Sequence, residues 1–173
     1  MDLLVILLRL LHVGLGALWV GMAVFTTVFL TPAIQEAGPD GGKVMAALQR
    51  RGIMTVLPAL AIGTLVSGIW LYWRDSGGFR PDFMRSGVGL AFGLGGLASL
   101  VAYGIGIGVL RPSMMRAAAL TQAMGSGLTE PERRVRMAEA QALQARGAAA
   151  GQAVTGLLLL ALAAMAVARY LPT

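Results

Sequence analysis

Arg9 and His12 are the residues whose types and spacing point most directly to chemistry. His12 is the only histidine of the 173-residue chain, and it follows Arg9 by three residues inside a long apolar segment. Ionisable groups at membrane depth are costly and usually face a protein interior, a cavity or a ligand. Neutral imidazole is a good ligand for haem iron or copper, and a guanidinium one turn away can reach a haem propionate. A haem b or copper pocket is therefore one interpretation of this pair.

The pair belongs to a stripe along its segment. At 100° per residue, the polar, small and aromatic positions fall within about 60° of one line, whereas the other faces carry Leu, Val, Ile, Phe and Met. We expect this stripe to face the interior of a helix bundle, with His12 roughly 13 Å deep at 1.5 Å per residue. Gly16, one turn from His12, would let a flat macrocycle lie close. The stripe comprises Arg9, His12, Gly16, Trp19, Ala23 and Thr26.

The other interpretation is that these residues serve packing. A buried histidine commonly bonds a neighbouring hydroxyl or carbonyl, and Arg9 can extend to the lipid headgroups. A single histidine also cannot ligate a haem from both sides within one protomer. We expect no enzyme activity, because the apolar segments hold no acidic pair and no carboxylate is expected near His12. The run Gly104-x-Gly106-x-Gly108 lies inside an apolar segment and does not predict a phosphate loop.

Composition and hydropathy predict the fold class. The chain is 57% apolar and 13% charged, against about 25% charge in soluble domains. Backbone groups in hydrocarbon must bond within their own segment, so the apolar stretches should be helices. We expect an all-α, polytopic membrane protein, a four-transmembrane-helix bundle forming a single domain over 1–173. The net charge of +6 fits a lipid surface here, and no nucleic-acid partner is expected. The spans are about 3–30, 53–73, 87–110 and 148–171.

Basic residues predict the orientation. Nine lie in the first and third connections and five lie on the other side. Cytoplasmic loops are enriched in Lys and Arg, so both termini are expected to be periplasmic, in a bacterial inner membrane. The nine are Lys43, Arg50, Arg51, Arg111, Arg116, Arg133, Arg134, Arg136 and Arg146; the five are Arg9, Arg74, Arg80, Arg85 and Arg169.

The chain also shows an internal repeat. A Leu-x-Pro motif ends the first and third spans, and a Gln-x-Arg-Gly motif opens the second and fourth. We therefore expect two tandem hairpins, about 1–74 and 85–171, related by a rotation about the membrane normal. The alternative is that both motifs are common at span ends. The matched pieces are Leu30-Thr31-Pro32 with Leu110-Arg111-Pro112, and Gln49-Arg50-Arg51-Gly52 with Gln144-Ala145-Arg146-Gly147.

The third connection contains a helix signal. Thr129, Pro131 and Glu132 have the spacing of a capping box with proline in the first turn. A helix should begin near Glu130 and run into the fourth span, and 114–124 is a candidate second helix. We expect Arg116, Arg133, Arg134 and Arg136 to contact anionic headgroups.

Small residues at four-residue spacing predict close helix packing, because lipid provides no hydrophobic force between helices. The motifs are Gly63-x-x-x-Ser67, Gly89-x-x-x-Gly93, Gly104-x-x-x-Gly108 and Gly147-x-x-x-Gly151.

Four segments carry a family resemblance: Leu11-His12-Val13, Trp19-Val20-Gly21, Leu30-Thr31-Pro32 and Ser67-Gly68-Ile69-Trp70-Leu71-Tyr72-Trp73. They resemble uncharacterised bacterial four-helix membrane proteins that are similar to the membrane portion of copper-resistance D proteins. The resemblance covers mainly the first half of the chain. It implies that His12 is a cofactor or metal ligand. The chain has no second histidine, which argues against metal transport.

Three functions follow from these observations. The first is a structural or accessory subunit that packs against other membrane proteins or against a second copy. The second is a haem b- or copper-binding redox or sensor protein. The third, a small-solute permease, has the least support, because no carboxylate lies within the spans to couple transport.

Overall fold

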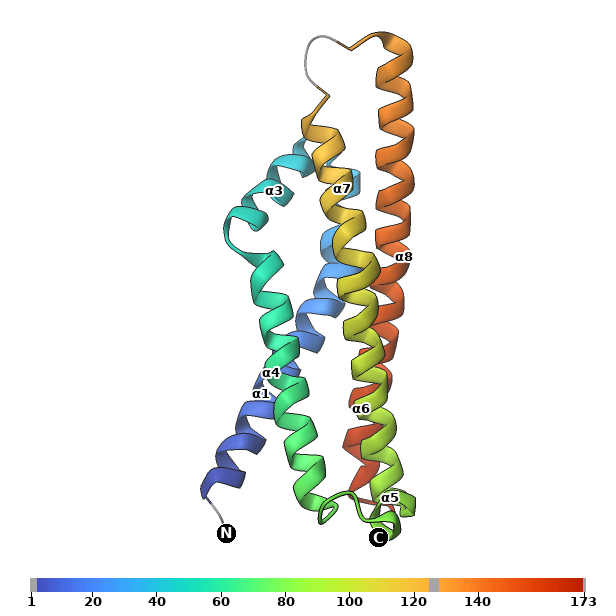
Figure 1. Cartoon of the computed structure of the whole chain (residues 1–173). Helices are drawn as coiled ribbons and strands as arrows, with labels where there is room; N and C mark the ends of the chain where they lie inside the picture. The colour runs from blue at the N-terminus through green and yellow to red at the C-terminus, as the bar shows by residue number, and fades with distance from the viewer. Residues whose placement is uncertain (1–2, 125–127, 173) are drawn as a thin grey trace.

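The computed structural model describes residues 3–124 and 128–172, and nearly all of these residues are helical (Figure 1). The first half comprises α1 (Leu3–Phe25), the π-helical turn η1 (Thr26–Leu30), α2 (Thr31–Glu36), α3 (Pro39–Arg50) and α4 (Ile53–Asp75). The second half comprises α5 (Pro81–Arg85), α6 (Gly87–Ile105), the π-helical turn η2 (Gly106–Leu110), α7 (Arg111–Gln122) and α8 (Glu130–Ala168).

Within the described residues, four helices are long and apolar enough to cross a bilayer: Leu3–Glu36, Ile53–Asp75, Gly87–Gln122 and Glu130–Ala168. The shortest has 23 residues, and about 20 suffice for the hydrocarbon core. The predicted all-α, four-helix membrane architecture is thus confirmed. Figure 1 places the start of α1 and the end of α8 at one end of the bundle, which we call the terminal end. At the other, the basic end, lie α3, α7 and the start of α8.

The first and third spans do not end at their prolines, contrary to our expectation. The helix continues through Pro32 into α2 and through Pro112 into α7, and in both cases a π-helical turn ends at the leucine of the Leu-x-Pro motif. Proline has no N–H and its ring clashes with the carbonyl four residues earlier. The wider π turn relieves this clash while the helix goes on.

Each hairpin packs mainly within itself. α1 lies along α4 and α6 lies along α8, while α4 with α6 and α1 with α8 form smaller interfaces between the hairpins. Exchanging the two hairpins would map this pattern onto itself, and the two π turns occupy equivalent places. Both features fit the expected duplication, but superposition of the hairpins by a rotation stays a prediction.

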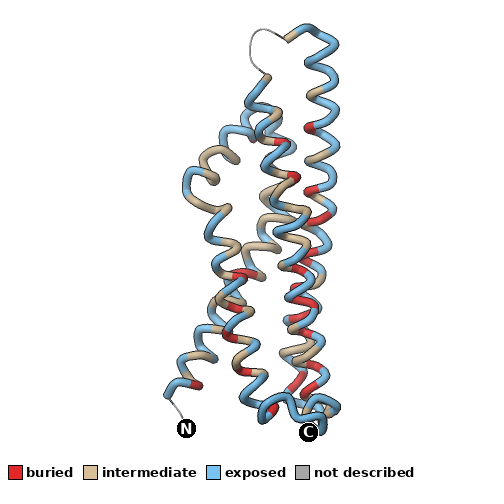
Figure 2. The backbone as a smooth tube through the Cα atoms, viewed as in Figure 1, coloured by how far each residue is buried: buried red, intermediate tan, exposed pale blue. Residues whose placement is uncertain are grey.

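The core lies where all four spans meet. Trp19 of α1 is 6% exposed and packs with small or branched side chains from the other three spans. These are Ala61 of α4, Ala102 of α6, and Val154 and Leu158 of α8. Figure 2 shows that buried residues concentrate along α6 and α8. The outward face of α1 is exposed and apolar, as lipid requires, through residues such as Leu7, Leu11 and Leu18.

The fourth span begins as predicted. The Thr129 hydroxyl accepts from the Glu132 backbone N–H, and the Glu132 carboxylate accepts from the Thr129 backbone N–H, which completes a capping box. From there α8 runs without a break through 39 residues. Figure 1 shows it extending beyond α3 and α7 at the basic end.

Candidate functional site

His12 is hydrogen-bonded across the α1–α4 interface. Its Nδ1 lies 2.9 Å from the carbonyl oxygen of Thr64 and 3.2 Å from the hydroxyl of Ser67. A carbonyl can only accept, so Nδ1 carries the proton in this contact. In the neutral ring, Nε2 then holds the lone pair. The imidazole is thus oriented by the backbone of a neighbouring span.

Glycines allow this approach of α1 to α4. A Cβ on Gly68 would lie 2.7 Å from Cε1 of the His12 ring, and a Cβ on Gly63 would lie 2.5 Å from a methyl of Leu15. A Cβ on Gly16 would meet the Thr64 methyl at 3.4 Å. The close packing predicted for Gly63-x-x-x-Ser67 is therefore confirmed, and its partner is α1, where Gly63 meets Leu15 and Ser67 meets His12.

Arg9 lies one turn further out and pairs with Asp75 at the end of α4. Its guanidinium nitrogen is 3.1 Å from Oδ2 of Asp75, and the two side chains are 58% and 30% exposed. Helical side chains lean toward the N-terminus of their helix, so Arg9 extends to the terminal end, where α4 stops. Sequence reasoning missed Asp75 as the partner. The available signal was that a hairpin brings the start of one span to the end of the next.

These positions allow the fit of a haem or a metal to be tested. His12 offers one nitrogen, Nε2, and α4 covers the side of Gly16 on which we expected a macrocycle. Among the described residues, no group of three His, Cys, Asp or Glu side chains gathers to hold a metal ion. His12 contacts a neighbouring carbonyl and a neighbouring hydroxyl, which are the contacts expected if the residue serves packing. Ligation of haem or copper through His12, Arg9 and Gly16 stays a prediction.

A second polar cluster joins the two hairpins. The hydroxyls of Thr27 and Thr155 lie 2.9 Å apart, and Thr155 also donates to the carbonyl of Ala23 at 3.3 Å. Thr27 donates to the carbonyl of Gly151 at 3.5 Å. Our sequence argument named Ala23 and Thr26 on this face but missed Thr27 and Thr155. The available signal was Thr155, which continues the four-residue spacing of the motif at Gly151, and Thr27, which follows Thr26 on the first span.

The small-residue motifs of α6 have different outcomes. Gly93 accommodates Tyr72 of α4, whose hydroxyl donates to the Gly89 carbonyl at 3.1 Å, whereas a Cβ on Gly89 would collide with the backbone of Phe83 in α5. Gly104 and Gly108 do not face a neighbouring helix closely, because a Cβ on either would find no atom within 4 Å. The prediction of close helix packing at Gly104-x-x-x-Gly108 was thus wrong within this chain.

The four arginines expected at lipid headgroups lie on two helices at the basic end. Arg116 is on α7, and the other three are in the first two turns of α8, roughly 50 Å from its other end at 1.5 Å per residue. Arg136 donates to the carbonyl of Ala123 at 3.3 Å. Headgroup contact by Arg116, Arg133, Arg134 and Arg136 stays a prediction.

Comparison with known proteins identifies no relative of this chain. No protein-family model, no curated protein and no solved structure matches this chain. The resemblance to copper-resistance D proteins therefore stays a prediction, and function has to be argued from the chain's own geometry.

Proposed function

We propose that this chain is a structural or accessory subunit of a bacterial inner membrane, which packs through α8 against another membrane protein or a second copy. The observation that carries the proposal is the outward face of α8. There, exposed positions recur every three or four residues over about seven turns, and most of them are Ala or Gly. They are Ala138, Ala142, Ala145, Ala149, Gln152, Gly156, Leu159 and Ala163.

The part of this face within the predicted span 148–171, from Ala149 to Ala163, differs from an ordinary lipid-facing surface. α1 exposes large side chains such as Leu7 and Leu11, whereas small residues are characteristic of helix–helix interfaces in membranes. The alternation of three and four is the spacing at which two helices remain in contact along a supercoil. A Cβ on Gly156 would meet no atom within 4 Å, so a second backbone can approach closely there.

Gln152 adds a polar argument. It is exposed on the same face, within the predicted span 148–171. An amide that faces hydrocarbon gains from a hydrogen bond to a neighbouring helix, by about 0.6–2 kcal/mol in model systems. An interhelical partner therefore accounts for a glutamine that lipid does not favour.

Cysteine cross-linking tests the proposal, because the chain has no cysteine of its own. Ala149→Cys and Gly156→Cys should give cross-linked products in native membranes at high yield. Leu94→Cys, on the exposed face of α6, is the matched control and should give little. The mass of the product distinguishes a second copy from another protein. Equal yields from both faces, or none from α8, would contradict the proposal.

A second candidate function is haem b or copper binding by His12. It has one specific observation in its favour, the bond from Nδ1–H to the Thr64 carbonyl. Metal-ligating histidines almost always donate their other ring N–H to a carbonyl, carboxylate or water, which fixes the tautomer. An absorption spectrum and metal analysis of the purified protein decide between the candidates.

The orientation is part of the proposal: the basic end faces the cytoplasm and both termini face the periplasm. The first and third connections carry nine Lys and Arg residues against five at the other side, and cytoplasmic enrichment of such residues sets topology. An odd number of membrane crossings would place the two termini on opposite sides of the membrane. In the structure α1 begins and α8 ends at the same end of the bundle (Figure 1), which supports placing both termini on one side.

A further inference from the structure

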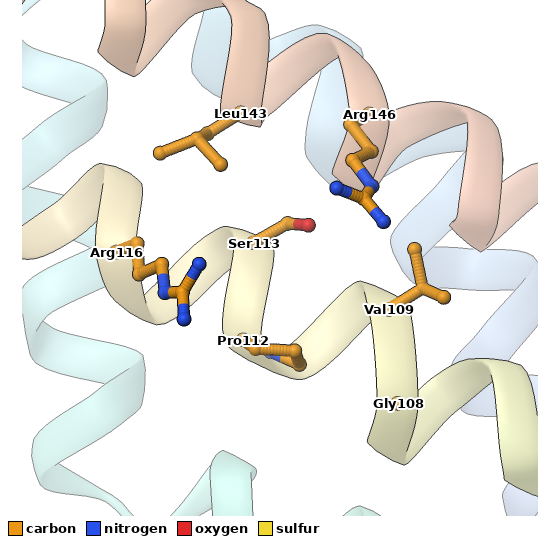
Figure 3. A pocket seen from close by; sticks show the side chains of 7 residues that line it. All are labelled: Gly108, Val109, Pro112, Ser113, Arg116, Leu143 and Arg146. Atoms are coloured by element: carbon orange, nitrogen blue, oxygen red, sulfur yellow. The ribbon is translucent and has the colours of Figure 1, made fainter.

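A small cavity lies at the basic end, where the chain leaves η2 and enters α7 beside α8. Its volume is about 140 Å³, several times the roughly 30 Å³ that one water takes up in the liquid. Figure 3 shows the side chains around it, with Ser113 between the two arginines. We call it the Arg116–Arg146 pocket; it is lined by Gly108, Val109, Pro112, Ser113, Arg116, Leu143 and Arg146.

The two arginines bring uncompensated positive charge to one place. Arg116 comes from α7 and Arg146 from α8. In the described part of the chain neither has a carboxylate oxygen within 4.0 Å, whereas Arg9, Arg74 and Arg80 each do. Two cations that line a shared cavity repel each other, and an anion between them removes this cost.

Ser113 adds a hydroxyl to the lining of the pocket. The residue is 4% exposed, yet its oxygen is not among buried side-chain atoms without a partner in the described part of the chain, so the hydroxyl is reached from the pocket. Other hydroxyls in these helices, such as Ser67 and Ser99, donate to the carbonyl four residues earlier. For Ser113 that carbonyl belongs to Val109, which lies inside η2. The π turn changes the register there, so the Ser113 hydroxyl remains available to a ligand in the pocket.

The depth of the pocket matches the headgroup layer. Ser113 lies on a helix that begins at Gly87, roughly 39 Å away at 1.5 Å per residue, and Arg146 is roughly 33 Å from the end of α8 at Ala168. The hydrocarbon core is about 30 Å thick, and the bilayer with its headgroups about 40–45 Å. If the terminal end marks one face of the core, the pocket lies where the opposite leaflet presents its phosphates.

We propose that the Arg116–Arg146 pocket binds a phosphate oxyanion, held by the two guanidinium groups and the Ser113 hydroxyl. Arginine is suited to this chemistry because its planar fork donates two parallel hydrogen bonds to phosphate oxygens. The phosphate belongs either to an anionic phospholipid headgroup or to a free phosphate, and both offer the same oxygens. The site does not depend on the packing of α8 against a partner.

Native mass spectrometry tests the lipid source. The protein is reconstituted in nanodiscs of equal parts phosphatidylglycerol and phosphatidylcholine, and the lipids that stay bound are counted. Wild type should retain phosphatidylglycerol in preference. Arg146→Gln should reduce this retention about tenfold, because it removes a charge-assisted hydrogen bond. Ser113→Ala should reduce it by a smaller factor, roughly threefold, since it removes a neutral bond.

The matched control is Arg50→Gln with Arg51→Gln, which removes two exposed charges at the same end of the molecule, outside the pocket and outside the set of arginines expected at headgroups. It should leave retention unchanged. An equal loss in the control would show a general basic surface and overturn the proposal. Ser113→Ala removes one oxygen atom and keeps both charges, so it remains informative if an arginine variant fails to fold.

Inorganic phosphate tests the second source. Wild type in nanodiscs of phosphatidylcholine alone is titrated with phosphate by calorimetry. Binding that Arg146→Gln and Ser113→Ala both weaken, without any preference for phosphatidylglycerol, would assign the pocket to a free phosphate. Preference for phosphatidylglycerol without phosphate binding would assign it to a lipid. Binding in neither assay would overturn the proposal.

Discussion

The imidazole of His12 packs directly on the backbone of Gly68, so that α1 and α4 touch at this point without an intervening side chain. A methyl group at position 68 would lie 2.7 Å from Cε1 and 3.2 Å from Nδ1 of the ring. The same Nδ1 is bonded to the Thr64 carbonyl one turn away. Position, tautomer and close packing of the histidine are therefore set by one surface of α4.

Gly68→Ala should consequently destabilise the protein. The added methyl must displace a ring that is hydrogen-bonded to the same helix, at the Thr64 carbonyl, and overpacking of this kind costs about 1–3 kcal/mol. Thermal unfolding in detergent measures the loss. Gly14→Ala is the matched control, because a Cβ on Gly14 would meet no atom within 4 Å. In a His12→Ala background the cost of Gly68→Ala should largely disappear, and a cost that persists there would refute the contact.

His12→Ala separates packing from ligation. If His12 only packs, the purified protein has a featureless visible spectrum before and after the change. The loss of stability should then be at the low end of the range for a broken buried hydrogen bond, about 1 kcal/mol, because the Ser67 hydroxyl still donates to Gly63 at 2.6 Å. If His12 is a ligand, the change abolishes a Soret band or stoichiometric copper. A Soret band in wild type that is lost in His12→Ala would establish the second candidate function.

The spans and the stripe on α1 were predictable because both follow from local physics. Apolar runs must be helical in lipid, and the angular positions of residues such as Trp19 follow from helix geometry. The capping box was predictable for the same reason, since Thr129 and Glu132 lie within one turn. These signals depend on residues close together in the sequence.

The passage of the helices through Pro32 and Pro112 was not predictable from the rule that proline ends a helix. A π turn competes with termination, and at membrane depth continuing the helix leaves fewer backbone groups without partners. The Arg9–Asp75 pair and the Arg116–Arg146 pocket were missed because each needs the rotation and register of one helix against its hairpin partner, which local sequence patterns do not determine. The pocket depends further on η2, which changes the face that α7 presents to α8.

The topology is open to a direct test. Met84 in α5 and Thr121 in α7 are both exposed and lie at opposite ends of the bundle. If the basic end is cytoplasmic, an impermeant maleimide should label Met84→Cys in intact cells. Thr121→Cys should react only after the membrane is permeabilised. The reverse pattern would overturn the proposed orientation.

The start of α8 should depend on pH. The Thr129 backbone N–H and hydroxyl donate to the Glu132 carboxylate at 2.9 and 2.8 Å, and these bonds lower the pKa of Glu132 from its ordinary value of 4.5. A pKa that is lower in the folded chain means that the bonds add stability above pH 4.5. The contribution is lost as the pH falls through the lowered value.

Amide hydrogen exchange at residues 130–135, corrected for its intrinsic pH dependence, should therefore accelerate in acid. Glu132→Gln should accelerate it at neutral pH as well, by weakening the bonds that Thr129 donates. Glu130→Gln is the control, since Glu130 lies in the same turn but outside the capping box. Exchange that does not change between neutral and acid conditions would show that the box contributes nothing.

An engineered disulfide can test the register that η2 sets between α7 and α8. A Cβ on Gly147 would lie 3.8 Å from the Cβ of Ser113, close to the mean separation of about 3.8 Å in disulfides. Ser113→Cys with Gly147→Cys should therefore form a disulfide on mild oxidation, with the flexible Met114 side chain moving aside. The control is Thr121→Cys with Gly147→Cys, which should form none because position 121 lies two turns away along α7.

Pro112→Ala restores a backbone donor to η2 and removes the reason for the π turn, so α7 should rotate toward regular α-helical register. Alkylation of free thiols should then show a clear fall in the yield of the Ser113–Gly147 disulfide. An unchanged yield would mean that packing against α8, and not Pro112, maintains the π turn.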